Sequence, residues 1–227
     1  KVEYSDKYKQ YVMKKSKSDK KDQTYFLYSI PKEVLPKVIL PLADFTDKSD
    51  IRKVAEAHNL KVATKKDSQE ICFIEDNDYV SFLKKNAKQE IKSGNIVLKD
   101  GTILGKHEGL IHYTIGQRKG LGISYKSPLY VIELNKEKNE VIVGEEKDLY
   151  KKELKAVDCN FLLDIDLSKE IEVMAKVRYR AKEAKAILKY ENNIAHVIFE
   201  EEQRAITRGQ SVVFYIDDIV LGGGKII

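Results

Sequence analysis

Cys72 is the residue whose type and surroundings best suit covalent chemistry in this 227-residue chain. Two lysines, Lys65 and Lys66, precede it by a few positions. The thiolate is the reactive form of cysteine, and nearby cations favour it. The alternative is an inert thiol in a buried strand, because free cysteine is among the most buried residue types. The second cysteine, Cys159, lies between an aspartate and an asparagine and is predicted to be structural.

The sequence predicts no metal site and no disulfide framework. The two cysteines are far apart, and neither belongs to a CxxC motif or to a His/Cys pair at zinc-like spacing. The four histidines are scattered, and no spacing indicates a Ser/His/Asp catalytic set. Covalent catalysis by this chain would therefore depend on Cys72.

A glycine-punctuated basic segment runs from Gly116 to Gly122 and contains Gln117, Arg118 and Lys119. Glycines allow the backbone to approach a ligand closely, while Arg and Lys neutralise phosphate. The segment is not a P-loop, because no Gly-Lys-Ser/Thr follows it and no helix is implied. It therefore indicates either a nucleic-acid contact or a flexible surface turn.

Basic residues also alternate at Lys176, Arg178 and Arg180. A continuous strand would present them as a row ~7 Å apart, close to the step between phosphates. The alternative is an ordinary charged barrel exterior. Basic side chains are in excess in three stretches, 1–23, 105–126 and 172–190, and the net charge is +5. This distribution suits a polyanion such as RNA, although a lysine-rich solvated surface would look the same.

The elements expected in the first third of the chain are short. Residues 47–60 predict an amphipathic helix that Asp47 or Ser49 can cap. The apolar run 71–74 around Cys72 predicts a buried strand, and residues 78–85 predict a short helix.

From residue 95 onward the pattern favours strands. Asp100-Gly101 is a strong hairpin signal, and a second hairpin is expected over 129–144. Apolar and polar residues then alternate between the turns Asn192-Asn193 and Asp217-Asp218, which indicates a small closed barrel. Composition shifts place boundaries near 75–80 and 146–150.

No stretch approaches the roughly 18 apolar residues of a membrane span. The start of the chain also has no apolar signal-peptide core, so we expect a cytoplasmic protein. Because the chain begins at Lys1, we expect either a removed leader or a fragment.

Several of these segments together resemble one family, the bacterial tRNA-specific 2-thiouridylases. Six motifs occur in the family's order: Lys21–Leu27, Lys66–Ile74, His112–Gly122, Val177–Arg180, Thr207–Tyr215 and Leu221–Gly224. The resemblance covers nearly the whole chain. It implies an α+β remnant of an α/β ATP-pyrophosphatase domain over 1–76, a small mostly-β central domain over 77–146 and an all-β barrel over 147–227.

The resemblance also implies an activity. Such enzymes use ATP with Mg²⁺ to adenylate the C2 oxygen of the wobble uridine, and sulfur then arrives as a cysteine persulfide. Cys72 matches the persulfide carrier. An upstream second cysteine of the family can pair with it in a disulfide. The implied partners are the anticodon arm of tRNA and a cysteine desulfurase or sulfur-relay protein that supplies the persulfide.

The same resemblance assigns tRNA contacts in four segments. These are Lys21, Asp22 and Gln23, then Gln117, Arg118 and Lys119, then Arg178 and Tyr179, and finally Gln210.

Two departures from the family pattern matter. Where the family commonly has Thr-Pro-Gly-Gln, this chain has Thr207-Arg208-Gly209-Gln210, and losing the proline is expected to loosen the turn. The pyrophosphate-binding loop, of the type Ser-Gly-Gly-x-Asp-Ser, does not occur in residues 1–227. We therefore expect no ATP bound by this chain alone and no uridine activation by it. The alternative function is a non-enzymatic RNA-binding or translation-factor-like module in which Cys72 is inert.

Overall fold

The computed structural model describes residues 1–18, 21–64, 82, 85–86 and 91–227. The chain divides into two compact units. The first unit joins Lys1–Lys65 with Lys152–Glu202 and Thr207–Ile227, and the second joins Lys66–Lys151 with Gln203–Ile206. The N-terminal segment thus shares a unit with the C-terminal third of the chain, rather than with the residues that follow it in sequence.

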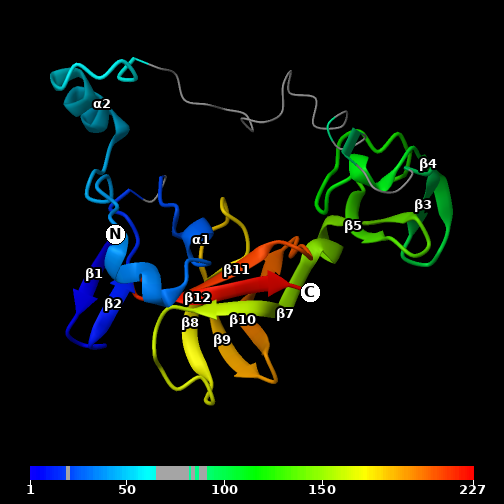
Figure 1. The fold of residues 1–227 in the computed structure, drawn as a ribbon. Helices are drawn as coiled ribbons and strands as arrows, with labels where there is room; N and C mark the ends of the chain where they lie inside the picture. Colours follow the sequence, from blue (N-terminus) through cyan, green and yellow to red (C-terminus); the bar gives the residue numbers. More distant parts are fainter. Residues whose placement is uncertain (19–20, 65–81, 83–84, 87–90) are drawn as a thin grey trace. The chain divides into compact units, whose positions relative to one another are not determined.

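A closed six-stranded barrel dominates the first unit (Figure 1), in the strand order β10-β7-β12-β11-β8-β9. Its strands are β7 (Tyr150–Phe161), β8 (Ile171–Lys176), β9 (Ala184–Glu191), β10 (Ile194–Arg204), β11 (Ser211–Ile216) and β12 (Ile219–Ile226). Alternate side chains such as Val173, Ala175 and Phe214 are buried. The barrel expected from the alternating pattern is confirmed.

Two tight turns of the barrel lie where the sequence predicts them. Asn192 and Asn193 connect β9 to β10 with φ of 51° and 61°, and Asp217, at φ 54°, begins the turn between β11 and β12. Asn and Asp tolerate this left-handed backbone better than most side chains do, and such turns match the twist of paired strands.

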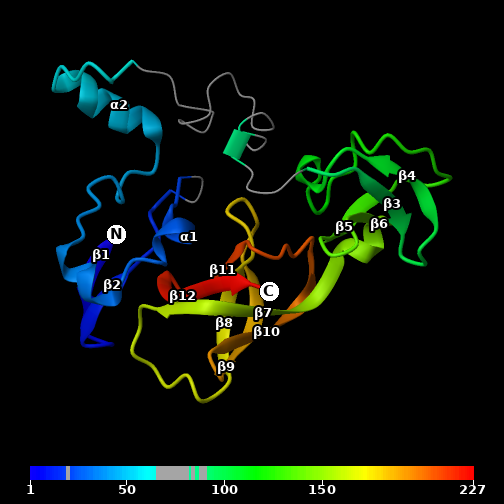
Figure 2. The same ribbon diagram turned by 45° about the vertical axis from the view of Figure 1, so that its right-hand side comes forward.

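The N-terminal segment packs against the outside of the barrel. Its packed part consists of the hairpin β1 (Val2–Ser5) and β2 (Gln10–Met13), the helical turn α1 (Thr24–Leu27) and η1 (Lys32–Lys37). Helix α2 (Lys48–Ala57) follows and has no buried residue. Met13, Tyr25 and Leu35 form one core with barrel residues, Tyr215 and Val220 among them. Figure 2 shows the hairpin and α1 beside the barrel, on the side of β11 and β12.

Helix α2 confirms the helix predicted over 47–60. The Asp47 carboxylate caps it by accepting a hydrogen bond from the Ser49 amide at 2.6 Å. Asn59, just beyond its end, has a left-handed φ of 52°, which ends the helical path.

The second unit contains a four-stranded sheet in the order β4-β3-β6-β5, coloured green in Figure 1. Its strands are β3 (Gly94–Leu98), β4 (Ile103–His107), β5 (Tyr130–Asn135) and β6 (Glu140–Gly144), with the 3-10 turns η3 (Leu110–His112) and η4 (Glu146–Leu149). The predicted Asp100-Gly101 turn joins β3 to β4, and Gly101 has a φ of 89°. Ile96, Leu121 and Val141 belong to its own apolar core.

One strand prediction is wrong. Strand β8 ends at Lys176, and residues 177–180 form a bend and a turn in which the Ala181 amide donates to the Arg178 carbonyl oxygen at 3.1 Å. The expected row of Lys176, Arg178 and Arg180 along one strand therefore does not exist. In this turn Arg178 contacts Thr207 and Tyr179 contacts Phe26, both far away in the sequence, where the alternating pattern gives no information.

Cys72 and the strand expected around it lie outside the described residues, as does most of the helix expected over 78–85. Within the part of the chain that the structure describes, no helix is long and apolar enough to span a membrane.

Candidate nucleic-acid interface

Asp22 organises the loop that precedes α1. The residue is only 8% exposed, and its carboxylate accepts hydrogen bonds from the amides of Ser16 at 2.7 Å and Thr24 at 3.0 Å. The Thr24 hydroxyl also donates to it. Lys21 and Gln23, on either side of Asp22, are exposed. Of the three residues assigned to RNA in this segment, Asp22 is therefore committed to the protein, while its two neighbours reach the surface.

Two tyrosines connect this segment to β11. The Tyr25 hydroxyl donates to the Ser211 carbonyl oxygen at 2.8 Å, and the Tyr28 hydroxyl lies 3.0 Å from Ser211 Oγ. Tyr215 contributes a third contact, because its hydroxyl lies 3.3 Å from Thr24 Oγ1. Burial raises the pKa of both Tyr25 and Tyr215, so both hydroxyls stay protonated at neutral pH.

Asn160 of β7 continues the connection at the end of α1. Its side-chain amide donates to the carbonyl oxygens of Tyr28 at 2.6 Å and Ile30 at 2.9 Å. The segment that carries Lys21 and Gln23 is therefore held by hydrogen bonds from two barrel strands.

We expect Asn160→Ala to lower the stability of the first unit by about 1–2 kcal/mol, because two partly buried carbonyl oxygens lose their donor. Asn160→Asp should cost more, since a carboxylate would face the same two oxygens. Chemical denaturation followed by tyrosine fluorescence measures both variants. Equal stability of Asn160→Ala and the parent chain would show that water replaces the amide at no cost.

Arg178 and the turn before β11 lie together. Arg178 Nη2 donates to Thr207 Oγ1 at 2.6 Å. Thr207 begins a β-turn that the Gln210 amide closes on its carbonyl oxygen at 3.2 Å, with Gly209 at φ 83°. A positive φ at the third position is typical of a type II turn, in which proline is common at the second position. The turn thus forms with Arg208 where the family has proline, and the Gln210 side chain is exposed.

Tyr179 completes the group by contacting α1. Its ring centroid lies 4.7 Å from that of Phe26 and 6.2 Å from that of Tyr25. The first unit therefore brings together three of the four segments assigned by resemblance, those of Lys21–Gln23, Arg178–Tyr179 and Gln210. The sequence did not indicate Phe26 or Thr207, although both lie within the quoted motifs.

The fourth segment belongs to the second unit, and its glutamine acts within its own loop. Gln117 Oε1 accepts from the Thr114 amide at 3.0 Å, and Gln117 Nε2 donates to the Lys119 carbonyl oxygen at 3.0 Å. Arg118 and Lys119 are exposed. Gln117 therefore shapes the loop, and the two cations are what the loop presents.

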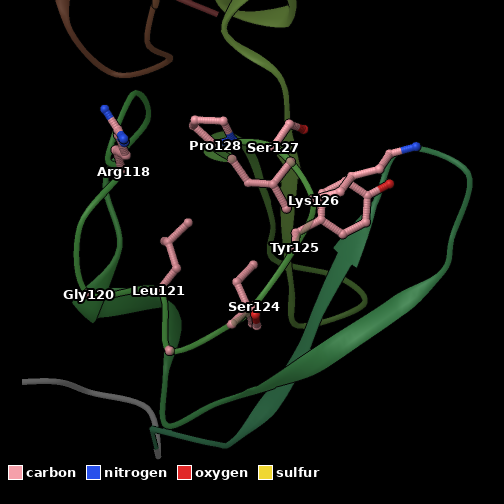
Figure 3. Close-up of a pocket in the computed structure, with 11 residues that line it drawn as sticks. Arg118, Gly120, Leu121, Ser124, Tyr125, Lys126, Ser127 and Pro128 are labelled. Carbon is pink, nitrogen blue, oxygen red and sulfur yellow. The ribbon is translucent and has the colours of Figure 1, made fainter.

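A pocket of about 470 Å³ lies in the same loop and is lined by Arg118 and by residues 120–129. Figure 3 shows Arg118 on one side of it, Tyr125 and Lys126 together on the other, and Ser124 and Ser127 between them. Two cations and three hydroxyls suit an anionic ligand. The basic stretch 105–126 pointed to this loop, but sequence alone did not single out Ser124 or Tyr125.

Cys159 of β7 does not resemble a sulfur carrier. Burial raises the pKa of its thiol to about 11, and its Sγ lies 3.7 Å from the Ala156 carbonyl oxygen. It is therefore protonated at neutral pH. Among the residues that the structure describes, no group of His, Cys, Asp and Glu could hold a metal ion.

Three family models match consecutive parts of the chain. The tRNA methyl transferase HUP domain matches residues 1–76, the tRNA methyl transferase PRC-barrel domain residues 80–145, and the aminomethyltransferase beta-barrel domain residues 151–226. The fold class expected from sequence is confirmed, with a partial HUP domain, a PRC-barrel middle domain and a six-stranded C-terminal barrel.

Curated relatives match over nearly the whole chain. The chain is 53% identical over 216 residues to "tRNA-specific 2-thiouridylase MnmA 2" of Clostridium botulinum, covering 95% of the chain and 61% of the relative. It is 49% identical to MnmA of Acetivibrio thermocellus over 99% of the chain, and 46% identical to MnmA of Clostridioides difficile over all of it. The chain spans 63% of the length of each of these two relatives. It is therefore a homologue of the MnmA tRNA-specific 2-thiouridylases.

Proposed function

We propose that the protein takes part in 2-thiolation of the wobble uridine of tRNA, with sulfur delivered as a persulfide on Cys72. The proposal is supported by about 50% identity to MnmA enzymes over nearly the whole chain. One structural observation supports it further: three of the segments assigned to tRNA lie together in the first unit. Hydrogen bonds and ring contacts connect the segment of Lys21 and Gln23 to β11 and to Tyr179, and connect Arg178 to the turn that ends at Gln210.

The chemistry follows from the poor leaving ability of a uridine C2 oxygen. Once that oxygen is activated, the terminal sulfur of a Cys72 persulfide attacks C2 and the activated oxygen departs. A second thiol then breaks the sulfur–sulfur bond, which leaves the thiolated base and a disulfide that includes Cys72. To reach the thiol, the base must leave its stack.

ATP is the activating reagent that the resemblance implies, but the residues present do not fit it. The chain lacks a Ser-Gly-Gly-x-Asp-Ser loop, and the glycine segment at 116–122 is followed by loop and strand rather than by a helix. We therefore assign residues 1–227 the roles of holding tRNA and carrying sulfur, and we expect no uridine activation by them alone.

The second candidate is a non-enzymatic RNA-binding module. Two observations favour it: residues 1–227 contain no Ser-Gly-Gly-x-Asp-Ser loop, and both units present exposed basic loops. The two candidates differ over sulfur transfer to Cys72, because only the first requires it.

Measurements of tRNA affinity at several salt concentrations test whether the chain binds tRNA and whether it does so through the candidate interface. Arg178→Ala should weaken binding roughly tenfold and lower the slope of log affinity against log salt by about 1, because a phosphate partner is lost. Gln210→Ala should weaken binding with an unchanged slope, because no charge is removed. Lys169→Ala, an exposed cation on the loop between β7 and β8, is the control with the same charge change. Unchanged tRNA affinity in both Arg178→Ala and Gln210→Ala would contradict the assigned interface.

A further inference from the structure

Phe26 is an exposed aromatic ring at the centre of the candidate interface. The residue is 55% exposed, although Thr24 and Tyr25 beside it in α1 are buried. Isolated exposed apolar residues are common on protein surfaces. Phe26 is not isolated, because its ring lies 4.7 Å from Tyr179 at an interplanar angle of 37°, and 5.4 Å from Tyr25 at 85°.

This arrangement leaves the ring fixed and accessible at once. Tyr25 is 4% exposed and bonded to Ser211, so it gives Phe26 a rigid edge contact from below the surface. Tyr179 is half-buried and supports Phe26 from the loop after β8. A preordered ring loses little conformational freedom when a ligand stacks on it.

The charges around the two rings are predominantly positive. Lys176 Nζ lies 5.9 Å from the centroid of the Tyr179 ring, and Arg178 and the exposed Arg180 flank that tyrosine in the chain. Two nearby carboxylates are already engaged. Asp22 accepts from backbone amides, and Glu183 lies 2.5 Å from Lys15 Nζ. An apolar ring among cations suits a ligand with a flat π-face on an anionic backbone.

We infer that Phe26, supported by Tyr179, is a stacking platform for an unpaired base of the tRNA anticodon loop. The inference rests on the proposed function and adds to it a residue that positions the RNA through a base rather than a phosphate. Single-stranded bases stack on aromatic side chains in many RNA-binding proteins, and each stack contributes about 1–3 kcal/mol. An apolar protein segment is the competing occupant of the ring, but unlike RNA it would bring no negative charge to the surrounding cations.

The test uses anticodon stem-loop RNAs that each carry 2-aminopurine at one loop position. Fluorescence of this base is quenched when it stacks on an aromatic ring. The parent chain should quench one loop position, and Phe26→Tyr should preserve both quenching and affinity. Phe26→Leu keeps an apolar side chain but has no π-face, so it should abolish the quenching and weaken RNA binding about tenfold.

Each outcome separates the inference from the function on which it rests. If Phe26→Leu binds and quenches as the parent chain does, stacking is wrong while the proposed function stands. If Phe26→Leu melts at the parent temperature, a loss of binding reports on the RNA contact. If its melting temperature falls, Phe26→Tyr and the quenching of the parent chain decide the question. A parent chain that binds no tRNA would contradict the proposed function itself.

Discussion

Incubation of the chain with a cysteine desulfurase and free cysteine should place one persulfide on Cys72 and none on Cys159. The two cysteines should differ in the fraction present as thiolate, which is the form that accepts sulfur. With a pKa of about 11, the Cys159 thiol has only ~1 thiolate in 3,000 molecules at pH 7.5. Its Sγ is also packed so closely against β12 that a methyl group on Gly224 would lie 2.6 Å from it. Intact-mass measurement detects the gain of one sulfur atom, and peptide mapping locates it.

Matched serine variants provide the control for this experiment. Cys72→Ser should lose the added sulfur completely, and Cys159→Ser should be loaded like the parent chain. Burial raises the pKa of Cys159, so its alkylation rate should rise as pH increases toward about 11 and remain negligible near pH 7. Sulfur found on Cys159, or an unmodified Cys72, would favour the RNA-binding module over the thiolation enzyme.

Replacing Gly223 by alanine should lower the stability of the first unit by roughly 3 kcal/mol. Gly223 lies in β12 between Val213 of β11 and Asn160 of β7. A Cβ atom there would lie 2.6 Å from the Val212 carbonyl oxygen and 2.8 Å from the Tyr28 ring. The first contact is with backbone and cannot relax without moving the sheet. Chemical denaturation measures the loss, and tRNA affinity should fall with it because Tyr28 belongs to the segment that carries Gln23.

Lys225→Ala is the matched control, because Lys225 is exposed on the same strand and its truncation leaves the packing unchanged. The double variant Gly223→Ala with Tyr28→Ala makes room for the new methyl group on one side. Its cost should therefore be smaller than the sum of the two single costs. Additive costs, or a Gly223→Ala variant as stable as Lys225→Ala, would contradict the close approach of Tyr28 to β12.

Local patterns predicted the local structure well. The alternation after residue 150, the asparagine and aspartate turns and the Asp47 cap all depend on neighbours within a few positions, and the structure confirms them. The sheet order could not be predicted in the same way. The parallel pairing of β3 with β6, for example, joins residues more than 40 positions apart.

The roles of individual site residues depended on contacts that the sequence pattern does not indicate. Asp22 reads as a surface residue in a lysine-rich segment, but Ser16 and Thr24 bind its carboxylate in a buried position. Arg178 reads as one of a row along a strand, but Thr207 binds its guanidinium after the strand has ended. Only the family resemblance indicated that these segments work together, because single-sequence patterns carry no information on which loops meet.

The core shared by the two ends of the first unit has a consequence for biosynthesis. Met13, Tyr25 and Leu35 are covered by Leu162, Val213 and Val220, which are translated far later. At ~5–20 residues per second, a ribosome needs roughly 10–40 seconds to pass from residue 37 to Ile226. During that interval the early apolar side chains are left without their permanent neighbours. The nascent protein is therefore most exposed to aggregation and proteases before its last strand emerges. A holding chaperone would be most effective at that stage.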